Sequence, residues 1–185
     1  MSKKAAIQRA ALELFVEQGI DATTTKQIAA RANTSEGNIY RHFSSKDALA
    51  ETLFFDHLLP FLEALDVAVS SRERMRDRLA EVVRIFYRTF DEDRVTFSYL
   101  LLSQHQHLAK FTESAETPVT FIHRLVQHAV AGGEIRSLEP MIATGTILGT
   151  ILQPATFVIY GRLDQPLSDH AETVVETIWR ALAPD

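Results

Sequence analysis

The chain has 185 residues, a formal net charge of −5 and no cysteine, which excludes disulfide frameworks and thiolate metal sites. Its hydrophobic content of 46% and charged content of 23% are typical of a globular chain that buries a core. Gln8 and Arg9 interrupt the apolar residues near the N-terminus, so we expect no secretory signal there and a cytoplasmic location.

The charge is divided unevenly along the chain. Residues 1–50 carry seven Lys and Arg against five Asp and Glu, whereas residues 51–185 carry twelve against nineteen. A basic segment on an acidic body can approach phosphate while the body resists nonspecific adsorption. The difference is small, so it favours nucleic-acid binding only in combination with a motif.

The first predicted helix covers residues 3–18. Its apolar residues repeat at helical spacing, and Gly19 is a typical C-terminal stop. These apolar residues are Ile7, Ala10, Ala11, Leu14 and Phe15. The basic side chains Lys3, Lys4 and Arg9 either approach a DNA backbone or are solvated charges.

Two short helices joined by a tight turn are predicted next. Thr24 and Thr25 can cap the first of them, and Ser35 can cap a second that carries Ile39, Tyr40 and Phe43. Asn33, between the two, tolerates the left-handed backbone of a tight turn. Such a pair is a helix-turn-helix, whose second helix fits the major groove of DNA.

Many positions at fixed spacing in this segment match a known pattern. The matching residues are Ala11–Phe15, Gly19–Ile20, Ala22–Thr25, Ile28–Ala32, Ser35, Gly37, Ile39–Tyr40, His42–Phe43 and Lys46–Leu49. Together they resemble the DNA-binding domain of the TetR-type transcriptional repressors. Asn33 departs from the glycine that is usual in the family's turn. The resemblance implies an all-α fold, with a three-helix DNA-binding domain at residues 1–48 and a helical ligand-binding and dimerisation domain at residues 49–185.

Side chains for two kinds of DNA contact are present in the motif. Hydroxyl, phenol, imidazole and ammonium groups suit phosphate, and the resemblance implies this role for Thr25, Lys26, Ser35, Tyr40, His42 and Lys46. Base edges are expected to be read by Glu36, Gly37, Asn38 and Arg41. Glu36 and Arg41 alternatively form local salt bridges.

A longer helix is predicted to follow the motif. Ser44 and Asp47 have capping-box spacing, and the apolar pattern continues through Leu49 and Leu53 to Pro60. A proline within a helix removes a hydrogen bond, so we expect the helix to bend or to restart there. Further amphipathic stripes at 75–90, 97–111 and 122–129 predict an all-helical remainder without strands.

Phenylalanines are numerous in these stripes. They either pack as an ordinary core or leave a cavity for an apolar small molecule, which is the inducer that the resemblance implies. The candidate ligand-binding residues are Phe54, Phe61, Phe86, Phe90, Phe97, Gln104, Phe121, Gln153 and Phe157.

Residues 141–161 carry no charge and are long enough to span a membrane. Thr144, Gln153 and Pro154 argue against a span, and a helix that is apolar all round is also typical of a buried interface. We therefore expect this helix and an amphipathic helix capped near Ser168 to form a dimer contact. The candidate interface residues are Gly145, Gly149, Val175, Ile178, Trp179 and Leu182.

Catalytic and metal chemistry find no support in the sequence. Phosphate-cradling and nucleophile-elbow motifs are absent, and His105/His107 and His123/His128 lack the i, i+4 spacing of a chelating pair. We predict no enzyme, no cofactor and no metal. The sequence predicts a dimeric, ligand-released repressor of a near-palindromic operator; the alternative is a small-molecule carrier with a non-functional DNA head.

Overall fold

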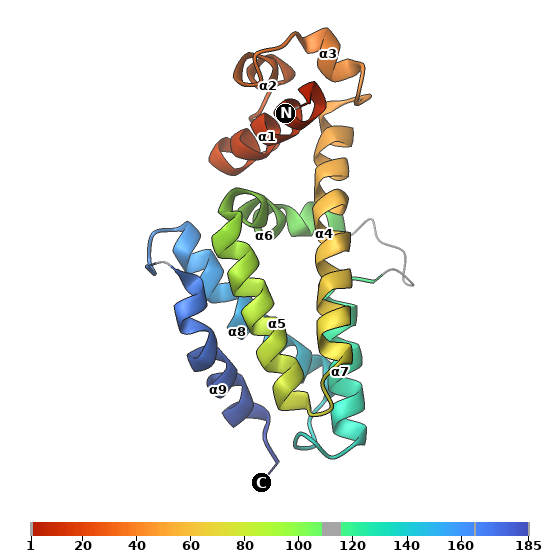
Figure 1. Ribbon diagram of the computed structural model, residues 1–185, viewed down its shortest axis with the longest axis vertical. Coiled ribbons are helices and arrows are strands. Elements are labelled where there is room, and N and C mark those ends of the chain that lie inside the picture. Colours follow the sequence, from red (N-terminus) through yellow and green to blue (C-terminus); the bar gives the residue numbers. More distant parts are fainter. Residues whose placement is uncertain (1, 109–115, 165, 185) are drawn as a thin grey trace. The chain divides into compact units, whose positions relative to one another are not determined.

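The computed structural model describes residues 2–108, 116–164 and 166–184, with the side chains of residues 105–108 left out of that description. Within these described ranges every regular element is a helix, which confirms the predicted all-α class (Figure 1). The chain divides into two compact units, one from residues 1–59 and 95–110 and the other from residues 60–94 and 111–185. The predicted boundary at residue 48 stays a prediction.

The first unit begins with three helices in the predicted order, α1 (Lys3–Gln18), α2 (Thr25–Arg31) and α3 (Glu36–Tyr40). Asn33 has φ of 49°, the left-handed conformation expected for the turn between α2 and α3. The second helix of the motif was predicted to include Phe43, and this is wrong because α3 ends at Tyr40. After Tyr40 the amides of His42 and Phe43 both bond to the carbonyl of Ile39, and this tight turn carries Phe43 into the core.

Helix α4 (Lys46–Ser70) follows. Its cap is Ser45, whose Oγ accepts from the Ala48 amide at 3.0 Å, and not Ser44 as the capping-box spacing predicted. The helix passes Pro60 without restarting. Helix α6 (Arg94–Leu108) joins the same unit from Val95 onward; its Tyr99 hydroxyl donates to the Ala50 carbonyl at 2.6 Å, and its ring stacks on Phe15.

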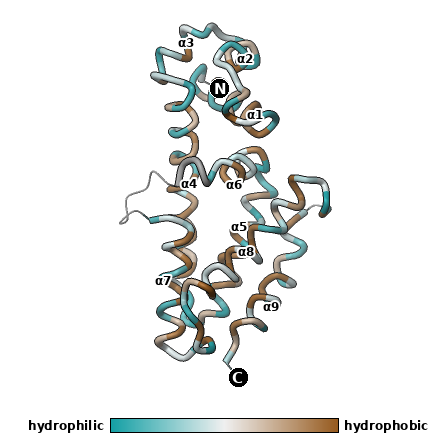
Figure 2. The backbone as a smooth tube through the Cα atoms, turned by 180° about the vertical axis from the view of Figure 1, so that it is seen from behind, coloured by the Kyte–Doolittle hydropathy of each residue, from teal (hydrophilic) through white to brown (hydrophobic). Residues whose placement is uncertain are grey.

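The second unit contains α5 (Met75–Glu92), α7 (Pro118–Ala131), α8 (Pro140–Ile159), a 3₁₀ turn η1 (Leu167–His170) and α9 (Ala171–Leu182). Helix α5 packs on α9, and α8 packs on both α7 and α9. The predicted last helix begins later than expected, because Ser168 lies in η1 and its amide bonds to Asp91 at 2.9 Å. Figure 2 shows brown and teal residues alternating along α9, as an amphipathic helix requires.

Helix α8 presents an exposed apolar side in the protomer. It is the one described helix that is long and apolar enough to cross a membrane, and 33% of its most apolar window is buried. Its large exposed residues are Met141, Ile142 and Phe157, and Tyr160 follows at the C-terminal cap. Exposed Gly145 and Gly149 lie between them, so this side offers a surface on which a second helix can pack closely.

Candidate nucleic-acid interface

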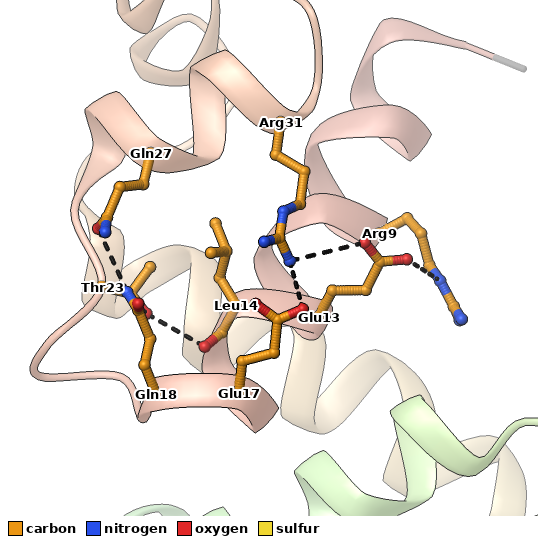
Figure 3. Close-up of polar contacts among 8 residues, drawn as sticks. All are labelled: Arg9, Glu13, Leu14, Glu17, Gln18, Thr23, Gln27 and Arg31. Atoms are coloured by element: carbon orange, nitrogen blue, oxygen red, sulfur yellow. Dashed lines mark hydrogen bonds and ion pairs between the residues drawn. The ribbon is translucent and has the colours of Figure 1, made fainter.

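Helix α2 is held by contacts at both of its ends, and Figure 3 shows those that Gln27 and Arg31 make with α1. At the start, Thr24 and Gln27 form a capping box. The backbone amide of Gln27 donates to Thr24 Oγ1 at 3.2 Å, and the backbone amide of Thr24 donates to Gln27 Oε1 at 2.8 Å. At the end, Arg31 pairs with Glu17 of α1 at 2.6 Å. The hydrogen bond from Arg31 lowers the pKa of the Glu17 carboxyl and raises that of the guanidinium.

The loop between α1 and α2 is held by hydrogen bonds from the side chains of Thr23 and Lys46 to its backbone. Thr23 is buried, and its hydroxyl donates to the Gly19 carbonyl at 2.7 Å. Lys46 Nζ donates to the carbonyls of Ile20 at 2.5 Å, Asp21 at 3.2 Å and Thr23 at 2.8 Å. All three ammonium hydrogens are therefore used on the backbone. Lys46 was expected to contact phosphate; in this structure its ammonium group stabilises the loop between α1 and α2.

The remaining phosphate candidates lie on the surface of the unit. Tyr40 has 53% of its side chain exposed, and Lys26, Ser35 and His42 are also exposed. Ser35 caps α3 through its backbone conformation and makes no side-chain capping bond. These hydroxyl, phenol, imidazole and ammonium groups are thus accessible to a nucleic-acid backbone.

The expected base-reading residues differ in their surroundings. Gly37 and Arg41 are exposed, and a Cβ on Gly37 would come near only Ser35 Oγ, at 3.9 Å, so the backbone there is open to close approach. Asn38 donates from Nδ2 to Thr34 Oγ1 at 3.0 Å. Glu36 accepts from Thr25 Oγ1 at 2.6 Å. Among the described residues, Glu36 is therefore bonded to a hydroxyl and does not form the local salt bridge given as its alternative role.

Sequence reasoning missed several residues that shape this surface. Gln18 Nε2 reaches Thr23 Oγ1 at 3.2 Å and Gln27 Oε1 at 3.3 Å, joining α1 to the capping box. Lys4 Nζ lies 5.8 Å from the centroid of the Phe43 ring. The spacing of Thr24 and Gln27 is a capping-box signal that the sequence contains, whereas the other contacts have no local signature.

The candidate ligand residues are divided between the two units. Phe54, Phe97 and Gln104 belong to the first unit and the other six to the second. Five of the phenylalanines are buried, namely Phe54, Phe86, Phe90, Phe97 and Phe121. Phe61 and Gln104 are half-buried, and the Phe61 and Phe86 rings meet edge to face at 6.0 Å. Gln153 and Phe157 are exposed on α8, so in the protomer these two face away from the core.

The candidate interface residues also separate into two groups. Gly145 and Gly149 are exposed, and Trp179 is half-buried. Val175, Ile178 and Leu182 are buried inside the protomer, because this side of α9 packs on α5 and α8. Those three side chains fill the protomer's own core, which leaves the opposite side of α9 for any partner.

The described surface includes two hollows outside α2 and α3. One of about 350 Å³ runs between α5 and α9, where Arg72, Arg76 and Arg84 are each paired with a glutamate. Another of about 160 Å³ lies among α1, the following loop and α6, beside Phe15 and Tyr99. In the described parts of the chain no group of three His, Asp or Glu is placed to hold a metal ion.

The geometry of α1 to α3 defines the class of protein, a helix-turn-helix DNA-binding protein. Residues 7–53 match the family model described as bacterial regulatory proteins, tetR family. Residues 7–53 therefore form a DNA-binding domain of the tetR family of bacterial regulatory proteins.

The relatives that are similar in sequence are regulators. The fatty acid metabolism regulator protein of Bacillus subtilis is 24% identical over 152 residues, which are 80% of this chain and 78% of that protein. The HTH-type transcriptional repressor Rv3405c of Mycobacterium tuberculosis is 46% identical over 54 residues, 29% of this chain and 28% of that protein. The second match thus spans only about a quarter of its relative.

Solved structures share the fold over nearly the whole chain. A tetR-family regulatory protein from Rhodococcus RHA1 has a TM-score of 0.82 at 21% identity and covers 100% of both chains. The FadR regulator of Bacillus subtilis, solved in complex with stearoyl-CoA, has a TM-score of 0.74 at 20% identity, covering 95% of this chain and 97% of that one. At this identity the likeness establishes the fold alone.

Proposed function

We propose that the protein is a ligand-responsive repressor that binds a near-palindromic DNA operator as a homodimer. The observation that carries the proposal is the exposed set of Lys26, Ser35, Tyr40, Arg41 and His42 on one helix-turn-helix. Lys26, Ser35, Tyr40 and His42 position α3 on phosphates, while Gly37, Asn38 and Arg41 meet base edges in the major groove. Such a regulator acts in the cytoplasm, where its DNA lies.

Dimerisation is proposed to occur through the exposed apolar side of α8. Burying Met141, Ile142 and Phe157 against a second copy removes apolar surface from water, and the small Gly145 and Gly149 allow the backbones to come close. A two-fold dimer presents two α3 helices, so the operator is expected to be an inverted repeat with half-sites about one helical turn or somewhat more apart.

Release is proposed to follow from binding of an apolar small molecule among the phenylalanines of the second unit. A fatty acyl group is the first ligand class to test. One relative from Bacillus subtilis is named for fatty acid metabolism, and one structural neighbour of this chain, a FadR regulator, was solved with stearoyl-CoA. A ligand that favours a conformation unable to bind operator weakens operator binding by the same factor that operator weakens ligand binding.

Selection of bound sequences from a random duplex pool by the purified full-length protein tests the DNA function. We expect an inverted repeat to be enriched. Three exposed cations per protomer, Lys3, Lys4 and Lys26, would neutralise about six phosphates per dimer, so log affinity should fall against log salt with a slope of about −5. Acyl-CoA, with CoA alone as control, is then titrated into the complex.

Absence of any enriched sequence, or a nearly flat salt dependence, contradicts the DNA-binding proposal. Strong binding of acyl-CoA together with no sequence preference would instead identify the protein as a small-molecule carrier with a non-functional DNA head. Enrichment of an operator that acyl-CoA fails to release would retain the regulator and reject this ligand class.

A further inference from the structure

Glu36 places a negative charge where a DNA-binding surface normally excludes one. Its side chain is exposed in the first turn of α3, the recognition helix of the proposed function. Among the residues that the structure describes, no ammonium or guanidinium group pairs with this carboxylate. Facing phosphates, an uncompensated carboxylate weakens binding to DNA of every sequence. Because Glu36 weakens DNA binding in general, we expect it to contribute to the choice of DNA sequence.

Within the described part of the chain, the Glu36 carboxylate accepts one hydrogen bond, which comes from Thr25. The Thr25 hydroxyl at the start of α2 donates to Glu36 Oε2 at 2.6 Å, across eleven positions of sequence. A hydroxyl has a single hydrogen to donate, and phosphate oxygens only accept. While Thr25 donates to Glu36, it therefore has no hydrogen for a DNA phosphate. The phosphate contact of Thr25 requires the bond to Glu36 to open.

Opening this bond leaves a carboxylate that needs a new donor. In the major groove the base that offers a donor without an adjacent acceptor on the same base is cytosine, through its N4 amino group. Adenine also offers an amino group, but its N7 acceptor lies beside it and repels a carboxylate. Only a cytosine can therefore replace the Thr25 hydroxyl at low cost.

We propose that Thr25 and Glu36 form a specificity lock. On nonspecific DNA the two side chains stay bonded to each other and neither contacts the duplex. At an operator with cytosine at one position of each half-site, Glu36 turns to the cytosine amino group and Thr25 is freed to donate to a phosphate. This inference rests on the proposed DNA-binding function and assigns it two specificity-determining residues that act as a pair.

Four variants of the full-length protein separate the lock from simpler roles. Glu36→Ala removes the carboxylate, and Glu36→Gln replaces it with an amide that suits adenine. Thr25→Val removes the hydroxyl at nearly constant shape, and Thr25→Ser is the matched control that keeps it. Each is put through the same random-duplex selection as the wild type and is titrated with the selected operator and with a scrambled duplex.

The wild type is expected to require cytosine at one position in each half-site. Glu36→Ala should lose that preference and bind the scrambled duplex several-fold more tightly, and Glu36→Gln should shift the preference toward adenine. Thr25→Val should weaken operator binding about tenfold and leave scrambled-duplex binding unchanged, because on such DNA the hydroxyl makes no phosphate contact. Thr25→Ser should behave as the wild type.

Two results would overturn the lock while leaving the regulator intact. One is a wild-type inverted repeat whose base preferences are all retained by Glu36→Ala. The other is equal weakening of operator and scrambled binding by Thr25→Val with a lowered thermal unfolding midpoint, which would make the pair a structural tie between α2 and α3. A wild type that enriches no sequence rejects the DNA-binding function and the lock together.

Discussion

Lys26 and Lys46 were both expected to contact phosphate, but their surroundings in the structure differ. Lys26 is exposed at the start of α2, whereas Lys46 is half-buried and donates to three carbonyls of the loop between α1 and α2. A charged donor shared by several carbonyls stabilises the fold, whereas an exposed cation mainly serves association. Stability and DNA binding should therefore separate between the two positions.

Lys46→Met keeps most of the aliphatic stem and removes the ammonium. We expect the free energy of unfolding to fall by about 2 kcal/mol, because three carbonyls lose a charged donor. Lys26→Met, the matched control, should unfold as the wild type and reduce the steepness of the salt dependence by about two per dimer. Chemical denaturation and DNA titration measure both effects; unchanged stability in Lys46→Met with weakened DNA binding would make Lys46 a phosphate contact.

Tyr99 predicts a response to alkaline pH. Burial raises the pKa of the Tyr99 phenol and the pKa of the Tyr87 phenol. The folded chain therefore keeps protons that the unfolded chain releases above about pH 10. The sign follows directly: stability is present below the ordinary tyrosine pKa and falls as pH rises, by up to about 1.4 kcal/mol per pH unit for each tyrosine.

Tyr99→Phe removes one of these two protons. At neutral pH it should cost about 1 kcal/mol, because the Ala50 carbonyl loses its bond from the hydroxyl, but its stability should fall less steeply than that of the wild type above pH 10. Unfolding in denaturant at several alkaline pH values measures the difference. Parallel stability curves for the two proteins would exclude a titrating Tyr99.

At the scale of elements, α4 is one helix that belongs to both compact units, and they divide between Leu59 and Pro60. Pro60 has no amide hydrogen to bond the carbonyl of Asp56, so the helix lacks one internal hydrogen bond at this division. A weakened turn at the division is a suitable place for a ligand-dependent change in helix direction.

Pro60→Ala restores the missing donor. We expect α4 to become more stable, operator affinity without ligand to stay near that of the wild type, and the ligand concentration needed for release to rise, because bending at this turn becomes more costly. Operator titrations with and without the effector measure the two properties separately. Equal loss of DNA affinity and ligand response would count against a transmitting role for this turn.

At the scale of the whole molecule, function is proposed to depend on a second copy. Gly149 lies on the exposed side of α8, and a Cβ built there meets no heavy atom within 4 Å in the protomer. A substitution at this position should therefore leave the protomer fold unchanged and act only on association.

Gly149→Glu would bury a carboxylate at the close helix contact of the proposed dimer. We expect sedimentation to report monomers, circular dichroism to remain as in the wild type, and operator affinity to fall by about a hundredfold, because the second half-site no longer adds to binding. Gln127→Glu on the exposed side of α7 adds the same charge elsewhere and is the matched control. A variant that stays dimeric would move the interface away from this side of α8.

The sequence by itself determined the helices and the DNA-binding motif, because those features depend on local chemistry. Apolar spacing selected the buried side of α1 through Ile7, Ala11 and Phe15, and the left-handed tolerance of Asn33 selected the turn. The predicted helix ends were less accurate where two neighbouring residues of the same type can both cap the helix, as Ser44 and Ser45 can before α4. The combined positions also identified the family.

Only the tertiary structure decided which side chains remain available to partners. Lys46 reaches the Ile20 carbonyl across 26 positions and Thr25 reaches Glu36 across eleven, so neither bond has a local signature. Packing of α9 on α5 and α8 likewise buried Val175 and Ile178, which the sequence had assigned to a partner. The physical reason is common to both: helical periodicity tells which side of a helix is apolar, whereas the groups that meet that side come from distant segments.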